Sequence, residues 1–174
     1  VQEAVDLMIL AFEKGEEYRN PVMLVADGMI GQMMEPVEIP EYEVEPSQDV
    51  EGHEEWATIG AKGRGQNLVK TLFLNPEQSF EHNIKLKEKY DLIEKNELQF
   101  EAVDAEAEMD VLIVSFGTMA RICKTSMVQL KEQGVKVGMI RPITLFPFPL
   151  QEIREAAARA KLVVSVELSM GRMV

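Results

Sequence analysis

Two hydrophobic periods alternate along the last third of the chain. Mainly apolar runs predict three strands, and the runs are typical of a parallel sheet buried on both faces: 111–116, 135–140 and 162–168. Apolar residues at helical spacing predict helices between them, at 118–134 and 150–160. Three prolines keep 141–149 from being helical. This order predicts an α/β fold, a three-layer parallel-sheet domain with right-handed crossovers.

The first part of the chain predicts a helix followed by a strand. Apolar residues at spacings of three and four indicate an amphipathic helix over 1–18, which Asn20-Pro21 ends. The apolar run 22–26 predicts a short strand buried on both faces. One helix and one strand cannot bury their own apolar faces. We therefore expect this chain to be a piece of a longer polypeptide.

The middle of the chain predicts an arm, a loop and a long helix. Residues 35–55 contain nine acids, no Lys or Arg and several prolines, which indicates extended chain or a linker and excludes a central strand. The glycines of 60–67 predict a flexible loop. Asn75-Pro76 then opens a helical pattern that continues to about Leu98.

Composition narrows the possible partners. The 174 residues include 30 acids and 18 bases, a net charge of −12, which argues against nucleic acid or an anionic membrane as a partner. No apolar run is long enough to span a bilayer, and cytoplasmic localisation is the expectation. The single cysteine, Cys123, cannot form an internal disulfide or hold an iron–sulfur cluster, and the two histidines lack metal-ligand spacing. No metal site is predicted.

Glycines in the first part do not form a phosphate-binding motif. The sequence 27-DGMIG-31 lacks the G-x-G-x-x-G pattern, so we interpret it as a turn. Loops at the carboxyl ends of parallel strands are nevertheless where such sheets bind ligands or partners. Four residues are expected at such ends: Asp27, Gly117, Arg141 and Glu167. Arg141 could clamp an anion bidentately or hold the following loop through backbone carbonyls, and we favour the structural role.

Four segments in order resemble a known family. They are VMLVADGMIGQMMEPVE at 22–38, VLIVSFGTMAR at 111–121, VKVGMIRPITLFPFP at 135–149 and LVVSVELSMGRMV at 162–174. Together they resemble the α subunit of 2-oxoacid:ferredoxin oxidoreductases, and within that family the 2-oxoisovalerate (3-methyl-2-oxobutanoate) branch. The family often has glutamine where Arg172 stands, which slightly weakens any role carried over for that turn.

The resemblance implies a domain plan. Residues 1–46 would be the tail of the α/β domain that binds the aminopyrimidine of thiamine diphosphate, 47–108 an acidic and helical linker, and 109–174 an incomplete domain similar to the C-terminal domain of transketolases. The segment 22–38 would then be a strand and turn that line the cofactor cleft or a subunit contact.

The resemblance also implies a reaction and its participants. The family oxidatively decarboxylates a branched-chain 2-oxoacid on thiamine diphosphate with Mg, reduces ferredoxin through iron–sulfur clusters on other subunits, and forms acyl-CoA. Its partners would be β and γ subunits, ferredoxin or a ferredoxin-like subunit, coenzyme A and the 2-oxoacid.

The family's working groups have no counterpart in this chain. By the resemblance, the carboxylate that activates the aminopyrimidine and the substrate-binding segment would precede Val1, and the diphosphate–magnesium motif would belong to the β subunit. No catalytic, cofactor-binding or metal-binding residue is therefore assigned. No cofactor is expected on this chain alone, and it is expected to be inactive by itself.

The sequence also offers weaker candidates for site residues, and it leaves two other functions open. Asp27 and Glu35 are near-cleft candidates, and Gly117, Arg141 and Glu167 are strand-end interface candidates. Self-association is expected through helix 1–18 and the methionines of 29–34, which would normally be covered. Two other functions stay open: a transketolase-type or 2-oxoacid dehydrogenase β-chain domain, and a non-catalytic α/β docking module.

Overall fold

The computed structural model describes residues 1–40, 56–58 and 60–171. Within these residues the chain forms two compact units, Val1–Val37 with Lys89–Val174, and Glu38–Glu88. Part of the predicted arm at 35–55, the boundary predicted at residue 46 and the turn at Arg172 lie outside the described residues. No helix within the described ranges combines the length and the apolar character needed to cross a bilayer.

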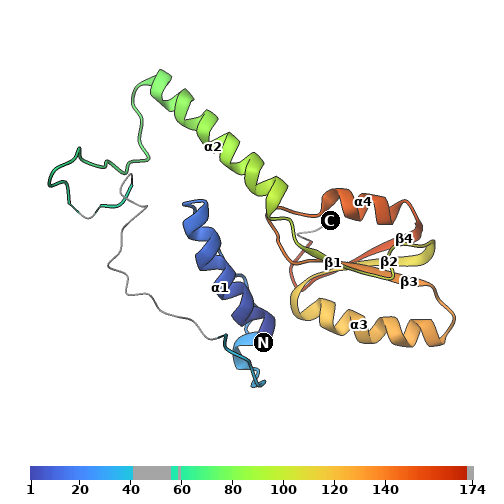
Figure 1. Cartoon of the computed structure of the whole chain (residues 1–174). Helices are drawn as coiled ribbons and strands as arrows, with labels where there is room; N and C mark the ends of the chain where they lie inside the picture. The colour runs from blue at the N-terminus through green and yellow to red at the C-terminus, as the bar shows by residue number, and fades with distance from the viewer. Residues whose placement is uncertain (41–55, 59, 172–174) are drawn as a thin grey trace. The chain divides into compact units, whose positions relative to one another are not determined.

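A four-stranded sheet forms the core of the first unit (Figure 1). Its strands stand in the order β1-β3-β2-β4: β1 (Phe100–Val103), β3 (Val137–Pro142), β2 (Met109–Ser115) and β4 (Ala160–Val166). The central pair β2–β3 and the pair β2–β4 are parallel, and β1 pairs antiparallel with β3 from Phe100 opposite Pro142 to Val103 opposite Met139. The three predicted strands are confirmed with ends shifted by one or two residues. β1 is an edge strand that the hydrophobic pattern did not predict.

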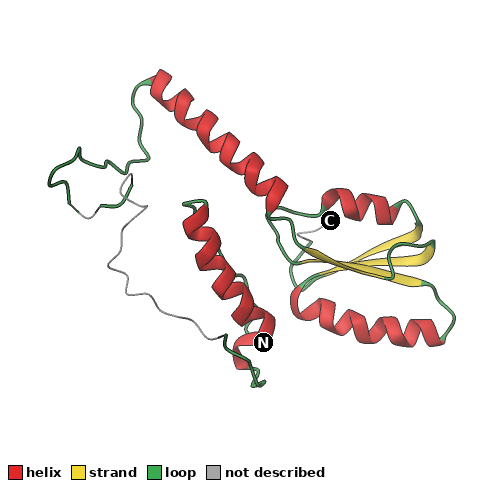
Figure 2. Ribbon diagram, viewed as in Figure 1, coloured by secondary structure: helices red, strands yellow, loops and turns green. Residues whose placement is uncertain are grey.

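Helices cover both faces of the sheet (Figure 2). Helix α3 (Gly117–Glu132) lies on one face and α4 (Leu150–Ala157) on the other. Alternate residues of β2 explain this, since Leu112 and Val114 pack with Ala156 of α4 whereas Ile113 packs with Ala120 and Cys123 of α3. The three-layer prediction is confirmed because the central strands are apolar on both faces.

One glycine permits a close approach at the edge of the core. A Cβ on Gly138 would lie 2.7 Å from the carbonyl oxygen of Asp104 and 2.8 Å from Sδ of Met109. The chain after β1 therefore passes directly over β3, which places β1 beside it.

The described residues include two further α-helices. α1 (Gln2–Glu17) confirms the amphipathic prediction but has no buried residue. α2 (Pro76–Asn96) begins after Asn75, whose Oδ1 accepts hydrogen bonds from the backbone N–H groups of Glu77 and Gln78 at 2.8 and 3.3 Å. The loop 60–67 is irregular, as predicted.

The strand predicted at 22–26 is wrong. These residues are irregular, and Val22, Met23 and Val25 are 48%, 83% and 65% exposed. A strand requires a hydrogen-bonded neighbour, and no described strand pairs with this segment. Asp27 therefore does not lie at the carboxyl end of a strand, where it was expected. The predicted turn is confirmed, because a short 3-10 helix, η1 (Ile30–Gln32), follows Asp27.

Candidate functional site

A cavity of about 530 Å³ lies in the first unit at the carboxyl end of the central strands. Its walls come from α1, from the irregular segment after it, from the residues that follow β2 and from those that follow β3. The walls are mainly apolar, and they include Leu7, Leu10, Leu24, Phe116, Ile143 and Phe146. The carboxyl edge of a parallel sheet is the usual place for a ligand or a partner in this class of fold.

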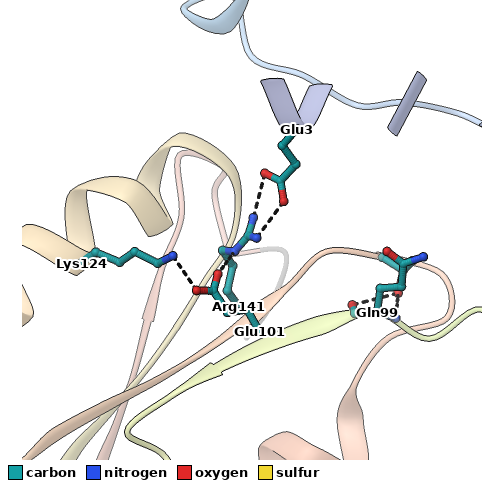
Figure 3. Close-up of polar contacts among 6 residues, drawn as sticks. Glu3, Gln99, Glu101, Lys124 and Arg141 are labelled. Carbon is teal, nitrogen blue, oxygen red and sulfur yellow. Dashed lines mark hydrogen bonds and ion pairs between the residues drawn. The ribbon is translucent and has the colours of Figure 1, made fainter. Parts of the chain in front are cut away.

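Arg141 connects the cavity wall to the sheet. It is the penultimate residue of β3, and its guanidinium donates to both carboxylate oxygens of Glu3 at 3.1 and 2.7 Å and through Nε to Glu101 at 2.7 Å (Figure 3). Lys124 of α3 donates to the second oxygen of Glu101, also at 2.7 Å. The partners of Arg141 are thus carboxylates and not the backbone carbonyls of the following loop, so the role predicted for Arg141 stays a prediction. Bidentate pairing fixes both the distance and the plane of the two groups.

Asp27 and Glu35 meet the start of α3. The Asp27 carboxylate accepts from the backbone N–H of Ile30 at 3.0 Å and forms a hydrogen bond with the side chain of Thr118. Glu35 accepts from Arg121 at 2.8 Å and from the amino group of Val1 at 3.2 Å. Gly117 adopts a positive φ of 59° at the first position of α3, where glycine has no steric penalty.

We call the three pairs Glu3–Arg141, Asp27–Thr118 and Glu35–Arg121 the strand-end contact. Four of the five residues selected from the sequence, Asp27, Glu35, Gly117 and Arg141, belong to it or directly adjoin it. Glu167 follows β4 and accepts a hydrogen bond from Ser169. Its place after the third parallel strand agrees with the expectation, and its role stays a prediction.

Sequence reasoning missed a second polar group at the other end of α1. Tyr18 is 9% exposed, and its hydroxyl donates to Glu97 at 2.6 Å, while Lys14 lies 3.1 Å from the same carboxylate. Glu97 follows α2, so these bonds tie the ends of the two helices together. The only sequence signal was an aromatic residue next to the helix-breaking Asn20-Pro21.

These contacts stabilise the charged forms. The hydrogen bond from Arg121 lowers the pKa of Glu35, and the bond with Thr118 lowers that of Asp27. The bond from Lys124 lowers the pKa of Glu101, and Arg141 adds to that effect despite partial burial. Bonds to Glu3 in turn raise the pKa of Arg141 above its already high value. All these groups are therefore ionised near neutral pH.

The cavity does not match a diphosphate or a divalent metal. Its two cations already face carboxylates, Lys14 with Glu17 and Glu97, and Arg141 with Glu3 and Glu101. Over 1–40, 56–58 and 60–171 no group of three His, Cys, Asp or Glu residues could hold a metal ion. A diphosphate would have to displace these carboxylates, so thiamine diphosphate with Mg does not fit the described residues, and we derive no chemical step through it.

The sequence matches two family models that together cover nearly the whole chain. The thiamine-diphosphate-binding region of pyruvate flavodoxin/ferredoxin oxidoreductases matches residues 1–102, and core domain II of pyruvate:ferredoxin oxidoreductase matches residues 109–174. We call these the first and second family regions. The strand-end contact joins them.

Individual relatives agree with the family models. Ketoisovalerate oxidoreductase subunit VorB of Methanothermobacter marburgensis is 41% identical over 99% of this chain and 48% of its own length. The 2-oxoglutarate synthase subunit KorA of Archaeoglobus fulgidus is 31% identical over 100% of this chain and 49% of its own. The chain thus spans about half the length of the curated relatives it matches.

A solved structure supports the fold. The 2-oxoglutarate:ferredoxin oxidoreductase from Magnetococcus marinus superposes with a TM-score of 0.51 at 23% identity, over 56% of this chain and 17% of that one. The resemblance predicted from the four sequence segments is confirmed by the family models and by the ketoisovalerate relatives. The chain belongs to the pyruvate flavodoxin/ferredoxin oxidoreductase family.

Proposed function

We propose that the chain is part of the α subunit of a thiamine-diphosphate-dependent 2-oxoacid:ferredoxin oxidoreductase. The complex would decarboxylate a branched-chain 2-oxoacid, pass the electrons to ferredoxin and release acyl-CoA in the cytoplasm. The observation that carries the proposal is the 41% identity with a ketoisovalerate oxidoreductase subunit along 99% of this chain.

The domain plan remains part of the proposal. Residues 1–46 are assigned to the pyrimidine-binding domain, 47–108 to a linker and 109–174 to the transketolase-like domain. Asp27 and Glu35 would lie near the cofactor cleft, with Gly117, Arg141 and Glu167 at an interface. Mg, the iron–sulfur clusters and the remaining subunits would come from the rest of the complex.

The cofactor would supply the carbanion chemistry, and this chain would supply scaffold. That division is supported by the strand-end contact, whose charged groups are matched with one another rather than directed at an open position. The chain's own contribution is to hold α1 and the segment up to Glu35 against the second family region.

The test is the purified complex that contains this chain, assayed with a viologen dye as electron acceptor. Dye reduction that requires both coenzyme A and a 2-oxoacid, fastest with 3-methyl-2-oxobutanoate, is the expected result. A faster rate with 2-oxoglutarate or pyruvate would overturn the branched-chain assignment. Acyl transfer to a lipoyl domain without dye reduction would favour the dehydrogenase alternative, and no turnover with any 2-oxoacid would favour the docking module.

A further inference from the structure

Helix α1 is attached by its ends and not by an apolar face. None of its residues is buried, and Met8 and Phe12 are 46% and 76% exposed. Along its inner side lies the cavity of about 530 Å³ rather than a packed core. Its fixed points are Glu3 on Arg141 at the first turn and the Lys14–Tyr18–Glu97 bonds at the last.

The strand-end contact has one sign of charge on each side. Glu3, Asp27 and Glu35 come from the first family region, and their partners Arg141, Thr118 and Arg121 come from the second. Residues 1–37 carry seven acids and two bases. The facing residues of α3 and the end of β3 supply cations and a hydroxyl, so the two surfaces are complementary in charge.

We propose that the start of α3 together with Arg141 is a cationic docking surface whose partner is the acidic segment 1–37 of the same chain, and that this docking is reversible. The contact is mainly electrostatic, because no residue of α1 is fully buried and its apolar side is only half-buried along the cavity. Electrostatic contacts between exposed groups weaken as salt screens them, whereas a packed apolar contact does not.

On the side of the second family region, opening of the contact leaves no buried charge without a partner. When Glu3 leaves, Arg141 keeps its bond to Glu101, so no guanidinium is left buried without a partner. On the leaving side, the Glu3 side chain is 52% exposed, and on the side of the second family region Arg121 is 67% exposed while it binds Glu35. Each of these groups gains water when the contact opens.

Release would be visible in α1. A helix of 16 residues without tertiary support is marginal in water, so undocked α1 should lose its backbone hydrogen bonds. Amide hydrogen exchange of the whole chain, resolved by peptide, therefore reports docking. Between 50 mM and 1 M NaCl we expect α1 to exchange about tenfold faster while β2 and β3 stay protected.

Substitutions separate this docking from general effects of salt. Arg121→Gln with Arg141→Gln should give fast α1 exchange already at 50 mM NaCl. The matched control is Lys161→Gln, which removes an exposed ion pair with Asp110 on β2 and should leave α1 unchanged. The exchanged pair Arg121→Glu with Glu35→Arg should restore the protection that Arg121→Glu alone removes.

Each outcome decides the proposal. Unchanged α1 exchange in the double Gln variant, or in high salt, would overturn it. If β2 and β3 also lose protection in that variant, the exchanged pair decides: restored α1 protection supports docking by charge, and failure to restore it overturns the proposal.

Discussion

At the scale of single residues, Arg141 shows how one side chain serves two elements. It binds Glu3 of α1 and Glu101 of β1 at the same time, and Lys124 shares Glu101. The shared carboxylate of Glu101 is less exposed than that of Glu3, with side-chain exposures of 34% and 52%. Its charge is therefore screened less by solvent than that of Glu3.

Glu101 gives stability a defined pH dependence. Its pKa in the folded chain is lowered from 4.5 by Lys124 and Arg141. A carboxyl with a lowered pKa in the folded state stabilises that state fully above its unfolded pKa and stops doing so as pH falls through its folded pKa. We therefore expect Glu101→Gln to make the decline in unfolding free energy below about pH 4.5 less steep.

Urea denaturation between pH 7 and pH 3 measures this slope. Glu132→Gln, at the exposed end of α3, is the matched control and should keep the slope of the unmodified chain. Equal slopes for the two variants would contradict the role assigned to Glu101.

Of the four residues expected at strand ends, Gly117 and Glu167 come after β2 and β4, Arg141 is the penultimate residue of β3, and Asp27 follows no strand. The sequence did not indicate what these residues contact. A residue after an apolar run is expected at the edge of a sheet, which is why Asp27, Gly117 and Arg141 could be selected. The partner Glu3 is 138 positions away from Arg141, and no local spacing relates them. Tyr18 and Glu97 were missed for the same reason.

At the scale of elements, pairing decides what the hydrophobic pattern leaves open. Residues 22–26 and β4 have similar apolar sequences, but β4 pairs with β2 along its whole length and the earlier segment has no strand partner among those described. β1 shows the reverse case. Its four residues carry little pattern, and antiparallel pairing with β3 makes them a strand.

Two serines, on β2 and β4, have buried hydroxyl oxygens that differ in hydrogen bonding. Ser115 is fully buried, and its Oγ donates to the carbonyl oxygen of Val166 at 2.8 Å. Ser165 has a buried Oγ with no hydrogen-bond partner in the structure as described. We expect Ser115→Ala to cost about 1 kcal/mol of unfolding free energy, and Ser165→Ala to cost nothing or to stabilise by a similar amount.

Chemical denaturation of the two variants side by side gives the comparison. Because they remove the same atom from neighbouring strands, the change in packing volume is the same for both. A larger loss for Ser165→Ala than for Ser115→Ala would contradict the hydrogen-bond assignment.

At the scale of the whole molecule, the family regions and the compact units divide the chain differently. The first family region ends at residue 102, within β1, whereas the first compact unit includes residues 1–37 and everything from Lys89. β1 therefore belongs by sequence to one region and by pairing to the sheet of the other. This sharing arises from long-range contacts and could not be read from local sequence pattern.

The burial of the sole cysteine gives the molecule a natural reporter. Cys123 is 5% exposed on the face of α3 that packs on Ile113 and Met139. A thiol reagent should therefore modify the folded chain far more slowly than the unfolded one, at a rate set by how often α3 lifts from the sheet. Arg121→Gln should leave that rate unchanged, since it acts on the opposite, exposed side of the helix, and modification as fast as that of a free thiol would contradict the packing. The native thiol of Cys123 therefore reports how often α3 separates from the sheet, and no engineered label is needed.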